Sequence, residues 1–184
     1  MPRRLALAAL PLVLIVALLS ACTESTRIPT AEPPSATQPL FASDEEALEA
    51  ATAAYEEYLA VLDSALQQPE KLEFPFSEVA GGSALDEARD SLNSFVDDGL
   101  RITGARQLME SKFQQSTLQG DIVEIQIYVC ESVANVDVLD LQGNSLVEPG
   151  RPELTAFEVT VFASAADALV HERIVWSGGG VCAG

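Results

Sequence analysis

The chain has 184 residues, with 28 acidic and 10 basic side chains, a formal net charge of −18, 3 Cys and 1 His. Its length and its 48% hydrophobic fraction are typical of one globular domain and exclude a wholly disordered chain. One His and three Cys exclude a His-based metal cluster and a four-Cys zinc site. The acidic excess argues against nucleic-acid binding, because neutralising phosphates requires clustered Lys and Arg.

The N-terminus has the organisation of an export signal. Two arginines precede an apolar run over residues 5–19, which is too short to cross a bilayer of about 30 Å comfortably. The run ends in Leu-Ser-Ala-Cys at 19–22, which resembles the lipobox of bacterial lipoproteins. The resemblance implies a signal peptide over 1–21 and a diacylglycerol thioether on Cys22, the first mature residue. An ordinary signal peptide or a membrane helix with a chance cysteine is the open alternative.

Residues 22–42 are predicted to form a tether. Four prolines lie there among small and polar residues, a composition that cannot build a core. Cleavage would leave 10 − 2 = 8 basic and 28 acidic side chains, a net charge of −20. Anionic headgroups repel such a surface, so acyl chains would hold the protein at the extracytoplasmic face of the cell membrane. The globular domain is expected over 43–184.

The domain is predicted to open with a long amphipathic helix. Ser43 followed by Glu46 forms a capping-box pattern. Apolar residues then recur at spacings of three and four until about Gln68, and Pro69 ends the helix. The predicted apolar face comprises Leu48, Ala51, Tyr55, Leu59, Leu62 and Leu66, whereas Glu45, Glu49, Glu56 and Asp63 are expected on other faces.

A second helix is predicted after a short irregular stretch. Residues 70–82 are expected to be irregular or to form one turn of helix. The second helix would start at Ser83 and end at Gly99, a left-handed C-cap. Its buried face is predicted to contain Leu85, Ala88, Leu92, Phe95 and Val96.

Beyond Leu100 the apolar period changes from about 3.6 residues to two. The cleanest alternation covers 121–130 and places Val123, Ile125, Ile127 and Val129 on one face of a half-buried antiparallel strand. Further strands are predicted over 102–109, 112–118, 135–141, 155–164 and 169–176. Two helices followed by an antiparallel sheet indicate an α+β fold.

The strand sequences carry a family resemblance. Val-Glu-Ile-Gln-Ile-Tyr-Val-Cys at 123–130, Val-Asp-Val-Leu-Asp at 136–140 and Val-Trp-Ser-Gly-Gly-Gly-Val-Cys at 175–182 resemble small secreted lipoproteins of high-GC Gram-positive bacteria. The order of elements is similar to the NTF2-like cone fold. Over residues 44–182 this implies an α+β domain in which two N-terminal helices pack on a curved antiparallel sheet.

Cys130 and Cys182 remain as a pair once Cys22 is lipidated. Exported proteins form disulfides readily, and two cysteines allow one connectivity. We therefore predict a structural disulfide, with two independent buried thiols or a redox or nucleophilic role as alternatives. The glycines at 178–180 would let the C-terminus fold back onto the sheet.

The resemblance also implies candidate catalytic residues, because some NTF2-like enzymes use a carboxylate with Tyr or His in the cone. The candidates are Tyr55, Tyr58, Tyr128 and His171. Tyr55 lies on an apolar helix face, which favours a core role. Strict alternation places His171 with Leu169, Arg173 and Val175 on one face of the last strand, and Val170, Glu172 and Ile174 on the other. We predict no catalytic residue among them.

No metal or cofactor is predicted. Asp137, Asp140 and Asn144 supply oxygen atoms that calcium prefers, but their spacing is not that of an EF-hand loop. They are interpreted as the solvated end of a strand.

Two function classes remain open. The first is a non-enzymatic envelope module that binds an envelope protein or a small apolar ligand, which the lack of a convergent catalytic set favours. The second is a small NTF2-like isomerase, dehydratase or cyclase that uses Tyr with Asp or Glu. A closed apolar interior would favour the first, and an open pocket containing a carboxylate would favour the second.

Overall fold

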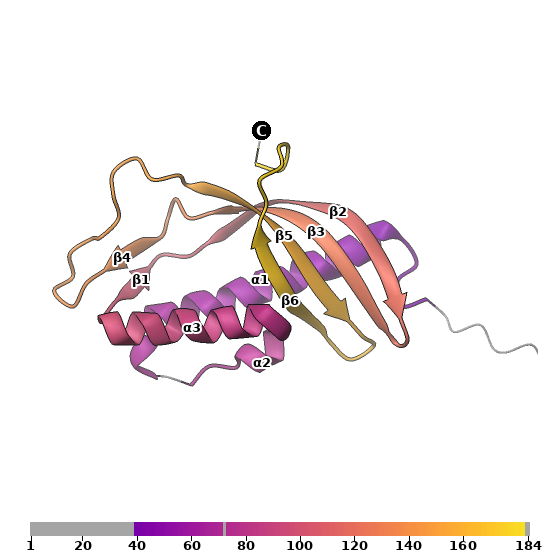
Figure 1. The fold of residues 1–184 in the computed structure, drawn as a ribbon, viewed down its shortest axis with the longest axis horizontal. Coiled ribbons are helices and arrows are strands. Elements are labelled where there is room, and N and C mark those ends of the chain that lie inside the picture. The colour runs from indigo at the N-terminus through magenta and orange to yellow at the C-terminus, as the bar shows by residue number, and fades with distance from the viewer. Residues whose placement is uncertain (1–38, 72, 183–184) are drawn as a thin grey trace, which may run out of the picture. The chain divides into compact units, whose positions relative to one another are not determined.

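The computed structural model describes residues 39–71 and 73–182 (Figure 1). The predictions for the signal peptide, Cys22 and most of the tether lie outside these residues. In the described ranges, no helix is long and apolar enough to cross a membrane.

Helix α1 spans Asp44–Gln67, close to the predicted bounds. The Oγ of Ser43 accepts a hydrogen bond from the backbone N–H of Glu46 at 3.3 Å. In return, Glu46 Oε2 accepts from the backbone N–H of Ala42 at 2.6 Å, one residue earlier than the usual capping box. The 3-10 helix η2, Pro69–Lys71, follows at once, as expected where proline cannot continue the α-helix.

The predicted start of the second helix at Ser83 is wrong by one residue. After α2 (Phe76–Val79), α3 spans Gly82–Asp98 with Gly81 as its N-cap. The N–H of Gly81 donates to the carbonyl of Val170 at 2.9 Å, and a Cβ on Gly82 would lie 2.4 Å from the His171 ring. Close approach to the sheet therefore sets this helix start. Gly99 is left-handed, with φ +65°, as predicted for the C-cap.

The strands form two antiparallel sheets, which confirms the α+β class. A four-stranded sheet has the order β2-β3-β5-β6, and β1 pairs with β4 in a separate ribbon. The bounds are β1 Arg101–Thr103, β2 Gln107–Gln119, β3 Ile122–Ser132, β4 Asp137–Leu139, β5 Leu154–Ala163 and β6 Ala168–Val175. Helices α1 and α3 pack against the four-stranded sheet (Figure 1), as predicted for two helices on an antiparallel sheet.

The predicted break between strands 102–109 and 112–118 is misplaced. The chain leaves β1 at Gly104, where φ is +76° and a Cβ would collide with the backbone of Asn135. One long strand, β2, then absorbs two extra residues, Met109 and Gln114, as bulges opposite β3. These bulges disturb the alternation that the prediction relied on.

The core lies between α1 and the helix-facing side of the four-stranded sheet. The four alternating residues predicted on β3 are all buried, and they pair with buried residues of β5. From the helix side the largest buried contributors are Tyr55, Tyr58, Leu59, Leu62 and Leu66. The period-two prediction for this strand is therefore confirmed.

The alternation predicted for the last strand is wrong because β6 contains a bulge. Thr160 pairs with Glu172, whereas the next residue, Val161, pairs with Val170, so His171 is an extra residue. Val170 and Arg173 consequently share the helix-facing side, although strict alternation separates them. The bulge thus directs Arg173 into the interior.

Candidate functional site

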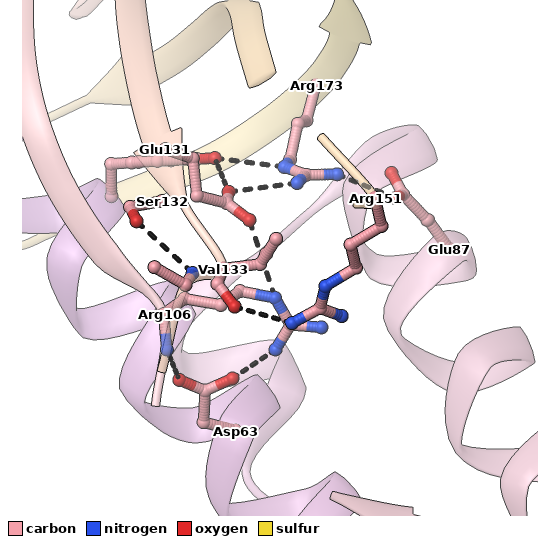
Figure 2. A network of polar contacts seen from close by, with 10 residues as sticks. Asp63, Glu87, Arg106, Glu131, Ser132, Val133, Arg151 and Arg173 are labelled. Atoms are coloured by element: carbon pink, nitrogen blue, oxygen red, sulfur yellow. Dashed lines mark hydrogen bonds and ion pairs between the residues drawn. The ribbon is translucent and has the colours of Figure 1, made fainter. Parts of the chain in front are cut away.

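Charged side chains meet in the interior between α1 and the sheet (Figure 2). We define the buried charge network as Asp63 of α1, Arg106 of the loop before β2, Glu131 of β3 and Arg173 of β6, with the phenol of Tyr55 between them. Their side chains are between 3% and 16% exposed. Two acids and two arginines balance, so the interior carries no formal net charge.

Glu131 is the centre of this network. It follows Val129 on the helix-facing side of β3 and is 2% exposed. Its Oε2 accepts hydrogen bonds from Tyr55 Oη at 2.8 Å and from Arg173 Nη2 at 2.9 Å, and its Oε1 lies 3.4 Å from Arg106 Nε. Both carboxylate oxygens are therefore engaged, as burial of a charge requires.

Arg173 connects the network to both helices. Its Nε donates to Tyr55 Oη at 2.9 Å, and its Nη1 donates to Glu87 Oε1 of α3 at 3.0 Å. The guanidinium carbon lies 3.5 Å from the centre of the Phe157 ring, a cation–π contact. Burial opposes the charge on Arg173, but attraction from the Tyr55 oxygen and Glu131 outweighs it and raises the pKa of Arg173. The guanidinium stays charged.

The phenol of Tyr55 takes part as a neutral group. Burial raises the pKa of Tyr55 far above its usual range, since the nearby positive charge of Arg173 offsets only part of the cost of removing a phenolate from water. Tyr55 therefore donates one hydrogen bond and accepts another. It cannot serve as a base near neutral pH.

Asp63 and Arg106 border an open groove. Arg106 donates to Asp63 through its backbone N–H, at 2.8 Å, and through Nη1. Burial raises the pKa of Asp63, although the adjacent Arg106 partly opposes this shift. The groove has a volume of about 680 Å³ between α1 and the start of β2, and its lining includes Leu59, Asp63, Gln67, Arg106, Leu108 and Met109.

The structure places the four residues considered as catalytic candidates in three different environments. Tyr55 joins the network, and Tyr58 is fully buried next to it, with ring centres 6.1 Å apart. Burial raises the pKa of Tyr58 to about 12, and its hydroxyl has no hydrogen-bond partner within the described part of the chain. Tyr128 lies on the opposite face of the sheet, where its ring packs against Trp176 at 4.5 Å.

His171 lies apart from the network. Its ring stacks on Phe162, with centres 4.1 Å apart, and packs against the backbone of Gly81 and Gly82. Over residues 39–71 and 73–182, no ion pair joins its ring to a carboxylate. Our expectation that His171 is not catalytic stays a prediction.

The three candidate calcium ligands stabilise a turn instead. Asp140 Oδ1 accepts from the backbone N–H groups of Gln142 and Asn144, at 2.9 and 2.8 Å, and its Oδ2 accepts from the Asn144 amide. Asp137 Oδ1 accepts from the Ser145 hydroxyl at 2.6 Å. The hydrogen bonds from Asn144 lower the pKa of Asp140. The described residues contain no group of three or more potential metal ligands.

The predicted disulfide is present in the structure. Cys130 and Cys182 are bonded across 52 residues, with Cα atoms 5.1 Å apart. The C-terminal segment turns back beside Trp176, where a Cβ on Gly178 would lie 2.3 Å from the indole. Lys112 Nζ also donates to the carbonyl of Gly180 at 2.5 Å. Close packing, more than flexibility, therefore explains glycine at 178.

The sequence prediction missed the charged members of the network. Asp63 lies four residues after Leu59, so helical spacing places it on the buried face, and its assignment to another face is wrong. Glu131 lies two residues after Val129, on the same face of β3. The predicted strand ended at Cys130, so Glu131 was not assigned to that face. Arg106 was expected within the strand predicted over 102–109, but it lies in the loop before β2. The bulge in β6 placed Arg173 on the face opposite to the predicted one.

Comparisons with known proteins give distant similarity alone. No family model matches the chain, and no curated protein matches it. The intermembrane space region of chloroplast protein ARC6 aligns at 17% identity and TM-score 0.48, covering 71% of this chain and 97% of that one. Aln2 from a Streptomyces species aligns at 17% identity and TM-score 0.39, covering 71% and 89%. At these TM-scores neither similarity carries an argument about a ligand or reaction. The observed elements themselves define the class, an α+β domain with a charged interior.

Proposed function

We propose that this chain is a cell-envelope lipoprotein, anchored at the extracytoplasmic face of the membrane through Cys22, whose α+β domain binds a partner without chemical change. The anchor is supported by the arginines, the apolar run and the Leu-Ser-Ala-Cys junction at 19–22. As a flexible coil, the tether over 22–42 would span roughly 25 Å, enough to lift the domain clear of the headgroups. The Cys130–Cys182 disulfide suits an exported protein.

Binding without catalysis is supported by one observation: the interior carboxylate is buried and paired with two arginines and a phenol. Glu131 is nearly inaccessible, and its oxygens face two arginines and a neutral phenol. A general base needs a free lone pair that faces the substrate. The interior is thus an apolar core that encloses a small set of paired charges, and the central carboxylate of that set is not open to a substrate.

Mass spectrometry of the mature N-terminus tests the anchor. We expect the wild-type chain to begin at Cys22 with lipid attached and to fractionate with membranes. Cys22→Ala should lose the modification, whereas Ser20→Ala, which keeps a small residue in the junction, should retain it. An unmodified Cys22 in the wild-type protein would contradict the anchor.

A second function is favoured by the groove beside Asp63. A carboxyl group with a raised pKa that lines an open groove is a candidate acid for an isomerase, dehydratase or cyclase. Against this, both Asp63 oxygens accept hydrogen bonds from Arg106. The binding function and the enzymatic function can be distinguished by nuclear magnetic resonance. A cell-envelope metabolite extract is incubated with wild type or with Asp63→Asn, and the two spectra are compared. A compound consumed by the wild type alone would favour the enzyme.

A further inference from the structure

The C-terminal end of α3 lies beside the β1–β4 ribbon (Figure 1). An apolar groove is found at this end of the helix. Its volume is about 270 Å³, and its apolar lining comprises Pro69, Phe95, Val96, Leu100 and Leu141. Leu141 is 80% exposed and Val96 is 38% exposed. Two large apolar side chains at the mouth of one groove offer surface that a binding partner would remove from water.

The exposed Leu141 is held in place. Asp140, next to it, accepts hydrogen bonds from the backbone N–H groups of Gln142 and Asn144. The Leu141 side chain packs over Gly99, where a Cβ would lie 2.9 Å from it. The backbone at Leu141 is therefore fixed by the turn before binding, which lowers the entropic cost of using this residue as an anchor.

The apolar groove continues into an acidic one. A shallow groove runs along α3 and is lined by Ser83, Asp86, Glu87, Asp90, Ser91, Ser94 and Phe95. Phe95 lines both grooves, which therefore adjoin, with Ser91 and Ser94 between the acidic side chains and the apolar end. We call the two adjoining grooves, with the exposed Asp97 and Asp98 at the end of the helix, the α3 surface.

Negative charge predominates at the apolar end, where Glu70 and Asp140 line the groove together with one basic residue, Arg101. Asp97 and Asp98 lie in the last turn of α3, which contains no basic residue. Acidic side chains are disfavoured there, because the helix dipole is negative at its C-terminus. Among the described residues, neither aspartate lies within ion-pair distance of a basic side chain. A cation from outside the chain would relieve this accumulation of negative charge.

We propose that the α3 surface docks a cationic, amphipathic segment of a partner protein, with an apolar side chain in the groove beside Leu141 and Lys or Arg side chains over Asp90 and Asp97. This proposal rests on the binding function proposed above and names its partner class. Anionic lipid and nucleic acid are repelled by the same acids that would attract such a segment. A second copy of the chain brings the same excess of negative charge.

The test uses the purified full chain in detergent and fluorescent peptides of about 14 residues, roughly four helical turns. One peptide carries Lys and Leu at helical spacing, and two matched peptides replace Lys by Glu or Leu by Ser. We expect measurable binding of the Lys/Leu peptide alone. Leu141→Ala should weaken it by about 10-fold, as loss of an interface anchor does. The control Leu118→Ala, at a residue 61% exposed near the far end of β2, should leave binding unchanged.

A charge variant separates docking from general attraction. Asp97→Asn with Asp98→Asn should weaken binding and flatten its salt dependence, yet raise Tm because it removes acids from the negative end of a helix. The control Asp121→Asn with Glu172→Gln removes the same charge elsewhere. Equal weakening by both pairs would overturn the proposal, since attraction to the net charge would then explain binding.

Two further results would also overturn it. One is binding of zwitterionic or anionic vesicles that depends on Leu141, and the other is a concentration-dependent dimer that Leu141→Ala abolishes. Absence of peptide binding by a protein that is lipidated at Cys22 would refute docking and leave the anchor intact. An unmodified Cys22 with selective peptide binding would refute the anchor alone.

Discussion

Replacing the central carboxylate is the most direct test of the buried charge network. Glu131→Gln keeps the shape of the side chain but leaves the guanidinium groups of Arg106 and Arg173 without their shared negative partner. Removing one member of a buried ion pair costs about 3–5 kcal/mol. Here one positive charge is left in excess in the interior, although Asp63 and Glu87 still pair with the two arginines. For a chain of this size, a loss of about 4 kcal/mol corresponds to a decrease in Tm of about 10 °C.

Urea and thermal unfolding, followed by circular dichroism, measure this effect. The matched control is Glu172→Gln on β6, whose exposed carboxylate should change the free energy of unfolding by less than about 0.5 kcal/mol. If Glu131→Gln proves too unstable to purify, Tyr55→Phe provides a milder test. It removes a single hydroxyl with two hydrogen bonds and should cost about 1–3 kcal/mol. A Glu131→Gln variant as stable as the control would refute the reasoning.

Three more predictions concern single side chains. Tyr58→Phe should leave the unfolding free energy unchanged or raise it by about 1 kcal/mol, because it removes a buried hydroxyl that lacks a hydrogen-bond partner in the described residues. A decrease in unfolding free energy as large as that of Tyr55→Phe would contradict this. Cys182→Ser should lower the free energy of unfolding by roughly 4 kcal/mol, because the disulfide no longer closes a loop of about 50 residues in the unfolded chain. Urea unfolding under non-reducing conditions measures this loss. An unfolding free energy equal to that of wild type would argue against a structural bond. Because the pKa of Asp63 is raised above its ordinary value of 3.8, its titration favours the folded state most below that value and progressively less as the pH rises through the folded-state pKa. The difference in unfolding free energy between wild type and Asp63→Asn should therefore shift against the wild type as the pH rises from below 3.8 towards neutral. A shift in the opposite direction would show that the pairing with Arg106 dominates.

The sequence predicted the fold where the pattern was regular. Helix α1 and strand β3 were located to within two residues, because a capping pattern, a proline and strict alternation mark them locally. The boundary between β1 and β2 was misplaced, since Gly104 and the bulges at Met109 and Gln114 depend on contacts with distant residues. Local periodicity contains no information about such contacts.

The charge network could be predicted from the sequence only in part, for a related reason. Its members come from four places along the chain, and a charged residue in a periodic segment is normally assigned to the solvent face. Glu131 and Asp63 carried a spacing signal that placed them with apolar residues. For Arg173 the spacing predicted the wrong face, because one extra residue in β6 turns its side chain to the helix-facing side of the sheet. Pairing of opposite charges across the interior cannot be inferred until the register is known.

The network also links the interior to the α3 surface. Buried ion pairs often add little stability compared with apolar side chains of similar size. The contribution of this network is therefore the directional bonds by which it fixes the elements relative to one another. Arg173 bonds Tyr55 of α1 and Glu87 of α3 together, while the buried side chains of α3 are two alanines and a leucine, which impose little directional constraint. We therefore infer that Arg173 positions α3, and with it the acidic groove. Arg173→Met should increase amide hydrogen exchange in α3 more than in β3. The control Arg89→Met, which replaces an exposed arginine of α3, should leave exchange in α3 unchanged. Equal protection of α3 in both variants would exclude a positioning role for Arg173.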